Sequence, residues 1–89
     1  MRYSVTRLCG GKALMVSPEK DLGLDLAKAA ETLSAVGDLG RFDGAMVTMS
    51  WEGMEVTLYA QGKIMFFPLE DRDAAVDKAK YLLGLVSGI

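Results

Sequence analysis

Histidine is absent from the sequence, and this absence removes several kinds of active site at once. Without an imidazole the chain cannot build a histidine general base, a Ser-His-Asp or Cys-His triad, or a zinc site that needs a histidine ligand. The single cysteine, Cys9, has no partner for an internal disulfide, and one thiolate cannot hold a structural metal ion. We therefore predict a protein that is not an enzyme and that has no catalytic residue, no cofactor and no metal.

Long apolar runs and an excess of positive charge are also missing. The longest uninterrupted apolar runs have about four residues, whereas a membrane span needs about 20. The first residues alternate polar and apolar and contain no apolar targeting segment. We therefore expect no membrane association and a cytoplasmic location. The 10 basic and 12 acidic side chains give a net charge of −2, which lacks the positive field of a typical nucleic-acid binder.

The sequence does contain enough apolar material for one core. Its 89 residues are 51% hydrophobic, and a second domain would need roughly 100 more residues. No linker, internal repeat or low-complexity segment divides the chain. We expect a single domain over residues 1–89.

The first half predicts a hairpin followed by a helix. Residues 2–8 alternate β-branched or aromatic side chains with polar ones, as a strand does. Gly10-Gly11 supplies the two positive φ angles of a type I′ turn, and residues 12–16 form the returning strand. Apolar side chains at spacings of three and four then predict a helix that begins at Leu24 and has Asp25 in its first turn.

The second half predicts two further hairpins and a second helix. Strands at residues 44–51 and 54–60 flank a Gly turn, and a third strand covers residues 63–67. Asp71 or Asp73 opens the last helix, because carboxylates are favourable at a helix N-terminus. The predicted order is β-β-α-β-β-β-α, an α+β fold with an antiparallel sheet and two helices on one face.

Strand parity indicates which side chains of the sheet face the helices. Ala45, Val47, Met49 and Trp51 share one face of their strand, and Trp51 is interpreted as a core anchor. A two-residue loop in the last hairpin would bury the charge of Lys63. A three-residue loop, residues 60–62, places Gly in the left-handed conformation and leaves Lys63 exposed, and we prefer it.

Two helices of this length cover one face of the sheet, so the other face is open, covered by a partner, or covered by the N-terminal hairpin. The side chains expected there include Glu55, and they are more apolar than a solvated face requires. The candidate binding residues mix methionine, aromatic and hydroxyl side chains with one lysine: Phe42, Met46, Thr48, Thr57, Tyr59, Lys63, Met65 and Phe67.

The chain also resembles one repeat of the TATA-box-binding protein family, over roughly residues 12–87. The resemblance rests on Arg41-Phe42 before an apolar strand, on the Gly-Lys turn within residues 56–65, and on the acidic start of the last helix. Residues 13–16 and 24–26 fit the opening strand and the entry to the first helix more loosely.

This resemblance implies a half-saddle, a curved antiparallel sheet with the helices on its convex side. In that family the concave face bends DNA with wedged aromatic side chains, and Phe42 and Tyr59 fall at the wedging positions. Because the chain corresponds to one repeat, a complete saddle requires a homodimer. The additional strand at residues 2–8 lies where it could pair at the dimerising edge.

Three further motifs have simpler explanations than a site. Cys9 is expected to be an ordinary hairpin cysteine, and Gly10-Gly11-Lys12 lacks the spacing of a phosphate-binding loop. The acidic cluster from Glu70 to Asp77 is explained by helix capping and the helix dipole.

We expect a non-enzymatic interaction domain that self-associates through a sheet edge or the open sheet face, or that binds another protein. Nucleic-acid binding by a dimeric concave face is an alternative, disfavoured by the negative net charge. A small-ligand protein is a second alternative, with Tyr59, Glu55 and Lys63 as its polar groups.

Overall fold

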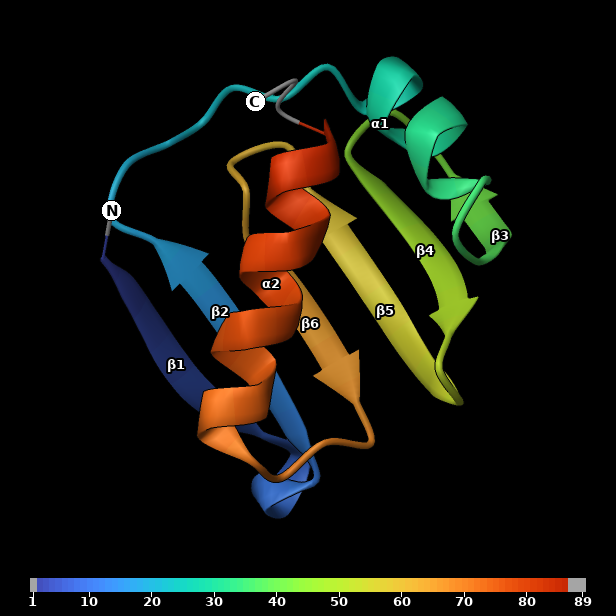
Figure 1. The fold of residues 1–89 in the computed structure, drawn as a ribbon. Helices are drawn as coiled ribbons and strands as arrows, with labels where there is room; N and C mark the ends of the chain where they lie inside the picture. The colour runs from blue at the N-terminus through green and yellow to red at the C-terminus, as the bar shows by residue number, and fades with distance from the viewer. Residues whose placement is uncertain (1, 87–89) are drawn as a thin grey trace.

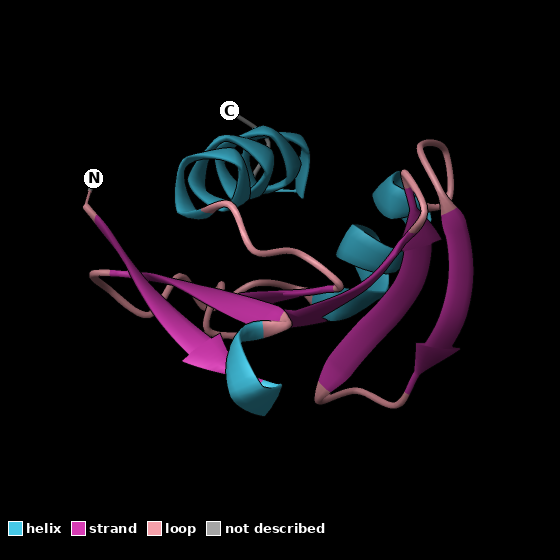
Figure 2. Cartoon of the chain, turned by 90° about the horizontal axis from the view of Figure 1, so that it is seen from below, coloured by secondary structure: helices cyan, strands magenta, loops and turns pink. Residues whose placement is uncertain are grey.

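The computed structural model describes residues 2–86, apart from the side chain of Cys9, and shows one sheet with two helices on the same side of it (Figures 1 and 2). All strand pairs are antiparallel, and the strand order is β1-β2-β6-β5-β4-β3. The predicted α+β class is confirmed. The elements are β1 (Tyr3–Leu8), η1 (Cys9–Gly11), β2 (Ala13–Pro18), α1 (Leu26–Leu33), β3 (Asp38–Phe42), β4 (Met46–Trp51), β5 (Met54–Tyr59), β6 (Ile64–Phe67) and α2 (Arg72–Val86).

The predicted elements occur in the predicted order, and the structure adds the strand β3. Its sequence, DLGRF, has no β-branched residue and no alternation, and all five residues are exposed. Its pairing with β4 has a bulge between Leu39 and Arg41, where the Arg41 N–H donates to Thr48 Oγ1 at 2.8 Å. Gly40 is needed beside this contact, because an added Cβ would lie 2.9 Å from Thr48 Oγ1. Tertiary pairing therefore forms a strand that local propensity does not favour.

Helix α1 begins two residues later than the sequence predicts. Asp25 is its N-cap, and its Oδ1 accepts hydrogen bonds from Ala27 N at 3.0 Å and Lys28 N at 3.3 Å. The N–H groups of Leu22 and Leu24 instead donate to carbonyls of the β5–β6 turn, at 2.9 and 2.8 Å. The apolar spacing continues outside the helix because this extended segment also packs on the core.

The hairpin registers agree with the predicted turns. Leu58 lies opposite Ile64, Gly62 has φ of 101°, and its N–H donates to Tyr59 O at 2.9 Å, so the loop has the three residues 60–62 and Lys63 is exposed. Positive φ angles at Glu52 and Gly53 form the two-residue turn between β4 and β5.

The core lies between the helices and one face of the sheet, as parity predicts. Ala45 is the exception, because it is exposed in the turn before β4. Leu14, Val16, Val47, Met49, Val56, Leu58, Ile64 and Phe66 contribute from the sheet, and Leu26, Ala29, Ala30, Leu33, Ala75, Ala79, Leu82 and Leu83 contribute from the helices.

The sequence places Asp71 or Asp73 at the start of α2, and the structure selects Asp71, whose Oδ1 accepts a hydrogen bond from Ala74 N at 3.1 Å. Within residues 2–86 no helix is both long and apolar enough to cross a membrane.

Candidate interaction surface

The sheet has a helix-free face, on the side opposite to α1 and α2 (Figure 2). The strand registers align one row of side chains across it: Thr6, Met15, Met65, Thr57, Thr48 and Arg41. A second, shorter row runs beside it, two residues further along the strands, and contains Met46, Tyr59 and Lys63. The structure therefore brings together most of the predicted binding residues.

Met15 was not among the predicted residues. It lies between the buried Leu14 and Val16, which face the helices, so its side chain points to the helix-free face. The alternation of residues 14–16 in the sequence already placed Met15 on the face opposite to Leu14 and Val16. That face could be identified as the helix-free one only when β2 was known to pair with β6.

Exposure varies strongly across the helix-free face. Thr57, in the middle of the sheet, is only 3% exposed, whereas Phe67 is 39% exposed. Met15, Met46, Thr48, Tyr59 and Met65 are half-buried by their neighbours on adjacent strands. A partner would therefore contact mainly the half-buried methionines, Tyr59 and Phe67, rather than Thr57.

The N-terminal hairpin does not cover this face. Strands β1 and β2 continue the sheet beside β6, and the short turn η1 at the end of this hairpin lies on the side away from the helices (Figure 2). No segment within residues 2–86 packs over the centre of the helix-free face in this view. Of the three arrangements that the sequence left open, the covering hairpin is wrong.

Phe42 does not belong to this face. The bulge in β3 places Arg41 opposite Thr48 and Phe42 opposite Val47, which is buried on the helix side. Phe42 is nevertheless 48% exposed, because it lies at the end of the edge strand. The prediction that Phe42 shares a surface with Tyr59 is wrong, because the two aromatic side chains lie on opposite faces of the sheet.

The polar groups suggested for a small ligand do not converge. Tyr59 and Lys63 are neighbours across the β5–β6 turn, but Glu55 lies four residues away along β5, about 13 Å at the usual rise of a strand. Glu55 is opposite Ser50 and Phe67 and is exposed.

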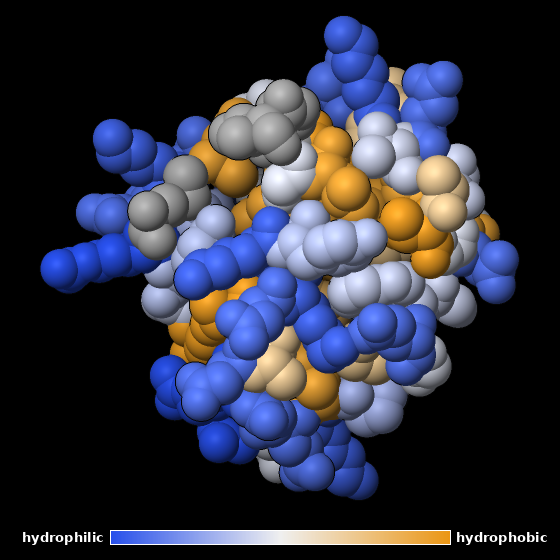
Figure 3. Space-filling model, in the orientation of Figure 1, coloured by the Kyte–Doolittle hydropathy of each residue, from blue (hydrophilic) through white to orange (hydrophobic). Residues whose placement is uncertain are grey.

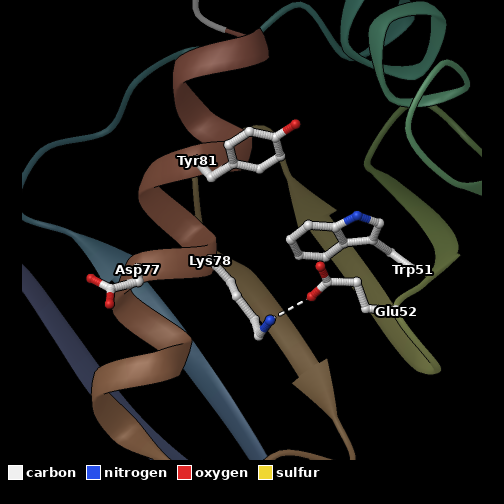
Figure 4. A pocket seen from close by; sticks show the side chains of 5 residues that line it. All are labelled: Trp51, Glu52, Asp77, Lys78 and Tyr81. Atoms are coloured by element: carbon white, nitrogen blue, oxygen red, sulfur yellow. Dashed lines mark hydrogen bonds and ion pairs between the residues drawn. The ribbon is translucent and has the colours of Figure 1, made fainter.

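A hollow of about 330 Å³ lies on the helix side and is lined by Trp51, Glu52, Asp77, Lys78 and Tyr81. The rings of Trp51 and Tyr81 stack at a centroid distance of 5.9 Å with planes 7° apart. The Lys78 ammonium pairs with Glu52 and lies 5.3 Å from the centre of the Trp51 ring (Figure 4).

These contacts connect the β4–β5 turn to α2, and we call Trp51, Glu52, Lys78 and Tyr81 the aromatic clasp. Trp51, interpreted from the sequence as a core anchor, is half-buried at the margin of the core. Lys78, the cation among the described residues that line the hollow, is already paired with Glu52. The clasp therefore explains the attachment of α2 without requiring a ligand. Elsewhere on this side, apolar surface occurs in separate areas among polar side chains (Figure 3).

The acidic cluster and the glycine pair singled out in the sequence have structural roles. Asp71 caps α2, and the described residues contain no group of three metal-binding side chains. Gly10 and Gly11 both have positive φ in the β1–β2 turn. The side chain of Cys9 lies outside the described part of the chain, so its expected role as an ordinary hairpin cysteine stays a prediction.

The sheet has two edges with different character. At one edge β1 is six residues long and pairs with β2 in uninterrupted register. At the other edge β3 is bulged and contains Asp38, Gly40 and Arg41. In the part of the chain that the structure describes, no strand pairs with the outer side of either edge.

Comparisons with models of protein families, with curated proteins and with solved structures found no match to this chain. The resemblance to one repeat of the TATA-box-binding protein family therefore stays a prediction from the sequence.

Proposed function

We propose that this chain is a non-enzymatic interaction domain that forms a homodimer through a sheet edge, in the cytoplasm. The observation that supports the proposal is the edge strand β1, which is regular, six residues long and without a partner on its outer side among the described residues. Such an edge offers a row of free N–H and C=O groups to another strand. A second copy of the chain is the simplest source of a matching strand, since most homo-oligomers are two-fold dimers.

The edge is a better place for a second copy than the helix-free face. The middle of that face is formed by Thr57 and its row neighbours, and the exposed charges of Glu55 and Lys63 lie on the same side. Burying those charges face to face would require partners for them, because an unpaired buried charge is costly. Edge pairing leaves them in water.

The chemistry of the chain also favours binding over catalysis. Histidine is absent, and the ammonium group in the hollow beside Trp51 is paired with Glu52. The single cysteine allows no internal disulfide, which suits the reducing cytoplasm.

Sedimentation velocity over a series from low to high micromolar concentration tests the proposal. We expect a reversible shift from the mass of one chain to that of two. A single species with the mass of one chain over the whole series would contradict self-association.

Nucleic-acid binding is the second candidate, and the observation that favours it is the placement of Arg41, Tyr59 and Lys63 on the helix-free face. The resemblance to the TATA-box-binding family supports the same surface. The net charge of −2 predicts a weak phosphate contribution.

Titration with a labelled AT-rich duplex at low and moderate salt tests this candidate. Tyr59→Ala should weaken binding, whereas Phe42→Ala should not, because Phe42 lies on the other face of the sheet. Equal losses from both variants, or no binding at low salt, would contradict it.

A further inference from the structure

The free backbone groups of β1 can be assigned to individual residues. Arg2 O accepts a hydrogen bond from Glu19 N at 3.0 Å, and Tyr3 lies opposite Pro18. In an antiparallel pair, hydrogen-bonded and non-hydrogen-bonded residues alternate. Arg2, Ser4, Thr6 and Leu8 therefore direct their N–H and C=O groups toward β2, and Tyr3, Val5 and Arg7 direct theirs outward. Pro18 fits this pattern, because its missing N–H would point away from β1.

The edge of β1 lacks the features that usually prevent strand pairing. It has no bulge and no proline, and Arg7 is its only charged residue. The opposite edge has a bulge at Leu39 and Arg41 and two charges in five residues, which are common ways to block an edge. A second copy would therefore add at β1 and not at β3.

We propose that two copies pair β1 against β1, antiparallel, with Val5 opposite Val5 of the second copy. This inference rests on the proposed homodimer and names its interface. In this register Tyr3 lies opposite Arg7 of the second copy, and every outward N–H and C=O group of the three residues finds a partner. A register shifted by two residues places either Tyr3 or Arg7 opposite a position outside β1.

The side chains agree with this register. Tyr3 and Val5 pack on the helix side of the sheet, and Arg7 lies opposite the buried Leu14 on the same side. Odd-numbered residues of one β1 therefore lie opposite odd-numbered residues of the other β1, on the same face of the joined sheet. The two-fold axis that relates the two copies runs perpendicular to the sheet. The guanidinium of Arg7 would meet a tyrosine ring, a favourable contact, instead of a second arginine.

Helix α2 contributes charged side chains near the proposed contact between Tyr3 and Arg7. Lys80 Nζ already lies 6.0 Å from the centre of the Tyr3 ring. Asp77, one turn earlier, projects away from Trp51, on the side of α2 where β2 and β1 run (Figure 4), so this side of α2 carries a carboxylate as well as a cation. Both α2 helices remain on the same side of the extended sheet, and the two helix-free faces join into one surface.

Cross-linking at the non-hydrogen-bonded positions tests the register. In the proposed dimer Ser4 lies opposite Thr6 of the second copy, where Cα atoms are about 4.5 Å apart and a disulfide can form. Both side chains are exposed on the helix-free face. In a Cys9→Ser background, the double variant Ser4→Cys plus Thr6→Cys should form a covalent dimer on mild oxidation.

The two single variants serve as matched controls, because each reports a different register. Thr6→Cys alone would cross-link efficiently only in a register that places residue 6 of one copy opposite residue 6 of the other. Ser4→Cys alone would do so only in a register that places the two copies of residue 4 opposite each other. Efficient cross-linking of either single variant, or none in the double variant of a dimeric protein, would overturn the register while leaving the homodimer intact. A monomer at all concentrations would overturn both.

Removing one outward donor gives an independent measurement. Arg7→Pro removes an N–H that points away from β2, so the hairpin ladder keeps its hydrogen bonds. We expect the dimer dissociation constant to rise by at least about tenfold, and to rise less in Arg7→Gln, which keeps the N–H. Circular dichroism would verify the fold of both variants. Equal dissociation constants for the two would overturn the assignment of the edge.

Discussion

At the scale of single residues, the β5–β6 turn depends on the absence of a side chain at Gly62. Its φ is 101°, and an added Cβ would lie 2.7 Å from Leu22 Cδ1 and 3.0 Å from Pro18 Cγ. Gly62→Ala should lower the free energy of unfolding by about 2–4 kcal/mol, from backbone strain together with overpacking.

Gly53→Ala is the matched control for that change. Its φ is 79°, but an added Cβ would contact nothing within 4 Å, so only the strain of about 1 kcal/mol remains. Urea unfolding measures both variants. A Gly62→Ala loss no larger than that of Gly53→Ala would show that the contacts with Leu22 and Pro18 relax freely.

Thr57 illustrates how a predicted binding residue can prove to be structural. It lies on the expected face, but at 3% exposure it has almost no surface to offer a partner. Thr57→Asp should destabilise the fold by about 2–4 kcal/mol, because it buries a charge without a partner. Thr6→Asp, on the same face but exposed and opposite the uncharged Met15, should cost less than about 1 kcal/mol. Similar losses in urea unfolding would contradict this difference.

At the scale of elements, α1 depends on its cap, because eight residues are too few for a helix that is stable by itself. Asp25→Ala should lower the free energy of unfolding by about 1 kcal/mol and increase hydrogen exchange in the first turn of α1. Asp25→Asn should keep most of the stability, since an amide oxygen also accepts the bonds from Ala27 and Lys28. An equal loss in Asp25→Asn would point to charge instead of capping.

The aromatic clasp predicts how α2 is attached to the β4–β5 turn. Tyr81→Ala removes the ring that stacks on Trp51, and Lys78→Met removes only the charge from a partly exposed ion pair. We expect a loss of about 1–2 kcal/mol for Tyr81→Ala and less than about 1 kcal/mol for Lys78→Met. Trp51 is the only tryptophan, so its fluorescence follows the unfolding of this contact. A larger loss from Lys78→Met would indicate that the ion pair dominates.

The elements that the sequence predicted well are those with strong local signals. Gly62 and the turn at Glu52 and Gly53 set the hairpin registers through their φ angles, and parity then selected the buried face. The strand β3 could not be predicted, because its pairing with β4 is tertiary and its bulge changes the parity that single-strand reasoning assumes. Leu22 suggested a longer helix, because an extended segment that packs on the core can repeat the same spacing.

At the scale of the whole molecule, parity predicted the helix-free face but not its limits. Phe42 was predicted to lie on this face but does not, because of the bulge in β3. Met15 was not predicted but lies on it, because β2 continues the sheet beside β6. Both changes depend on strand order, which no local pattern encodes. The same order places β1 at the edge of the sheet, and the proposed dimer would double the helix-free surface without burying it.

Dimerisation also predicts that thermal stability depends on protein concentration. If unfolding is coupled to dissociation, mass action raises the midpoint by about 4 °C for each tenfold increase in concentration, given the usual unfolding entropy of two chains of this size. Arg7→Pro should remove most of this dependence, because it weakens the dimer and leaves the fold of each chain intact, whereas Arg7→Gln should retain it. Calorimetry over a hundredfold range of concentration makes the measurement. A midpoint that is constant for the unsubstituted chain would mean that folding does not depend on a second copy.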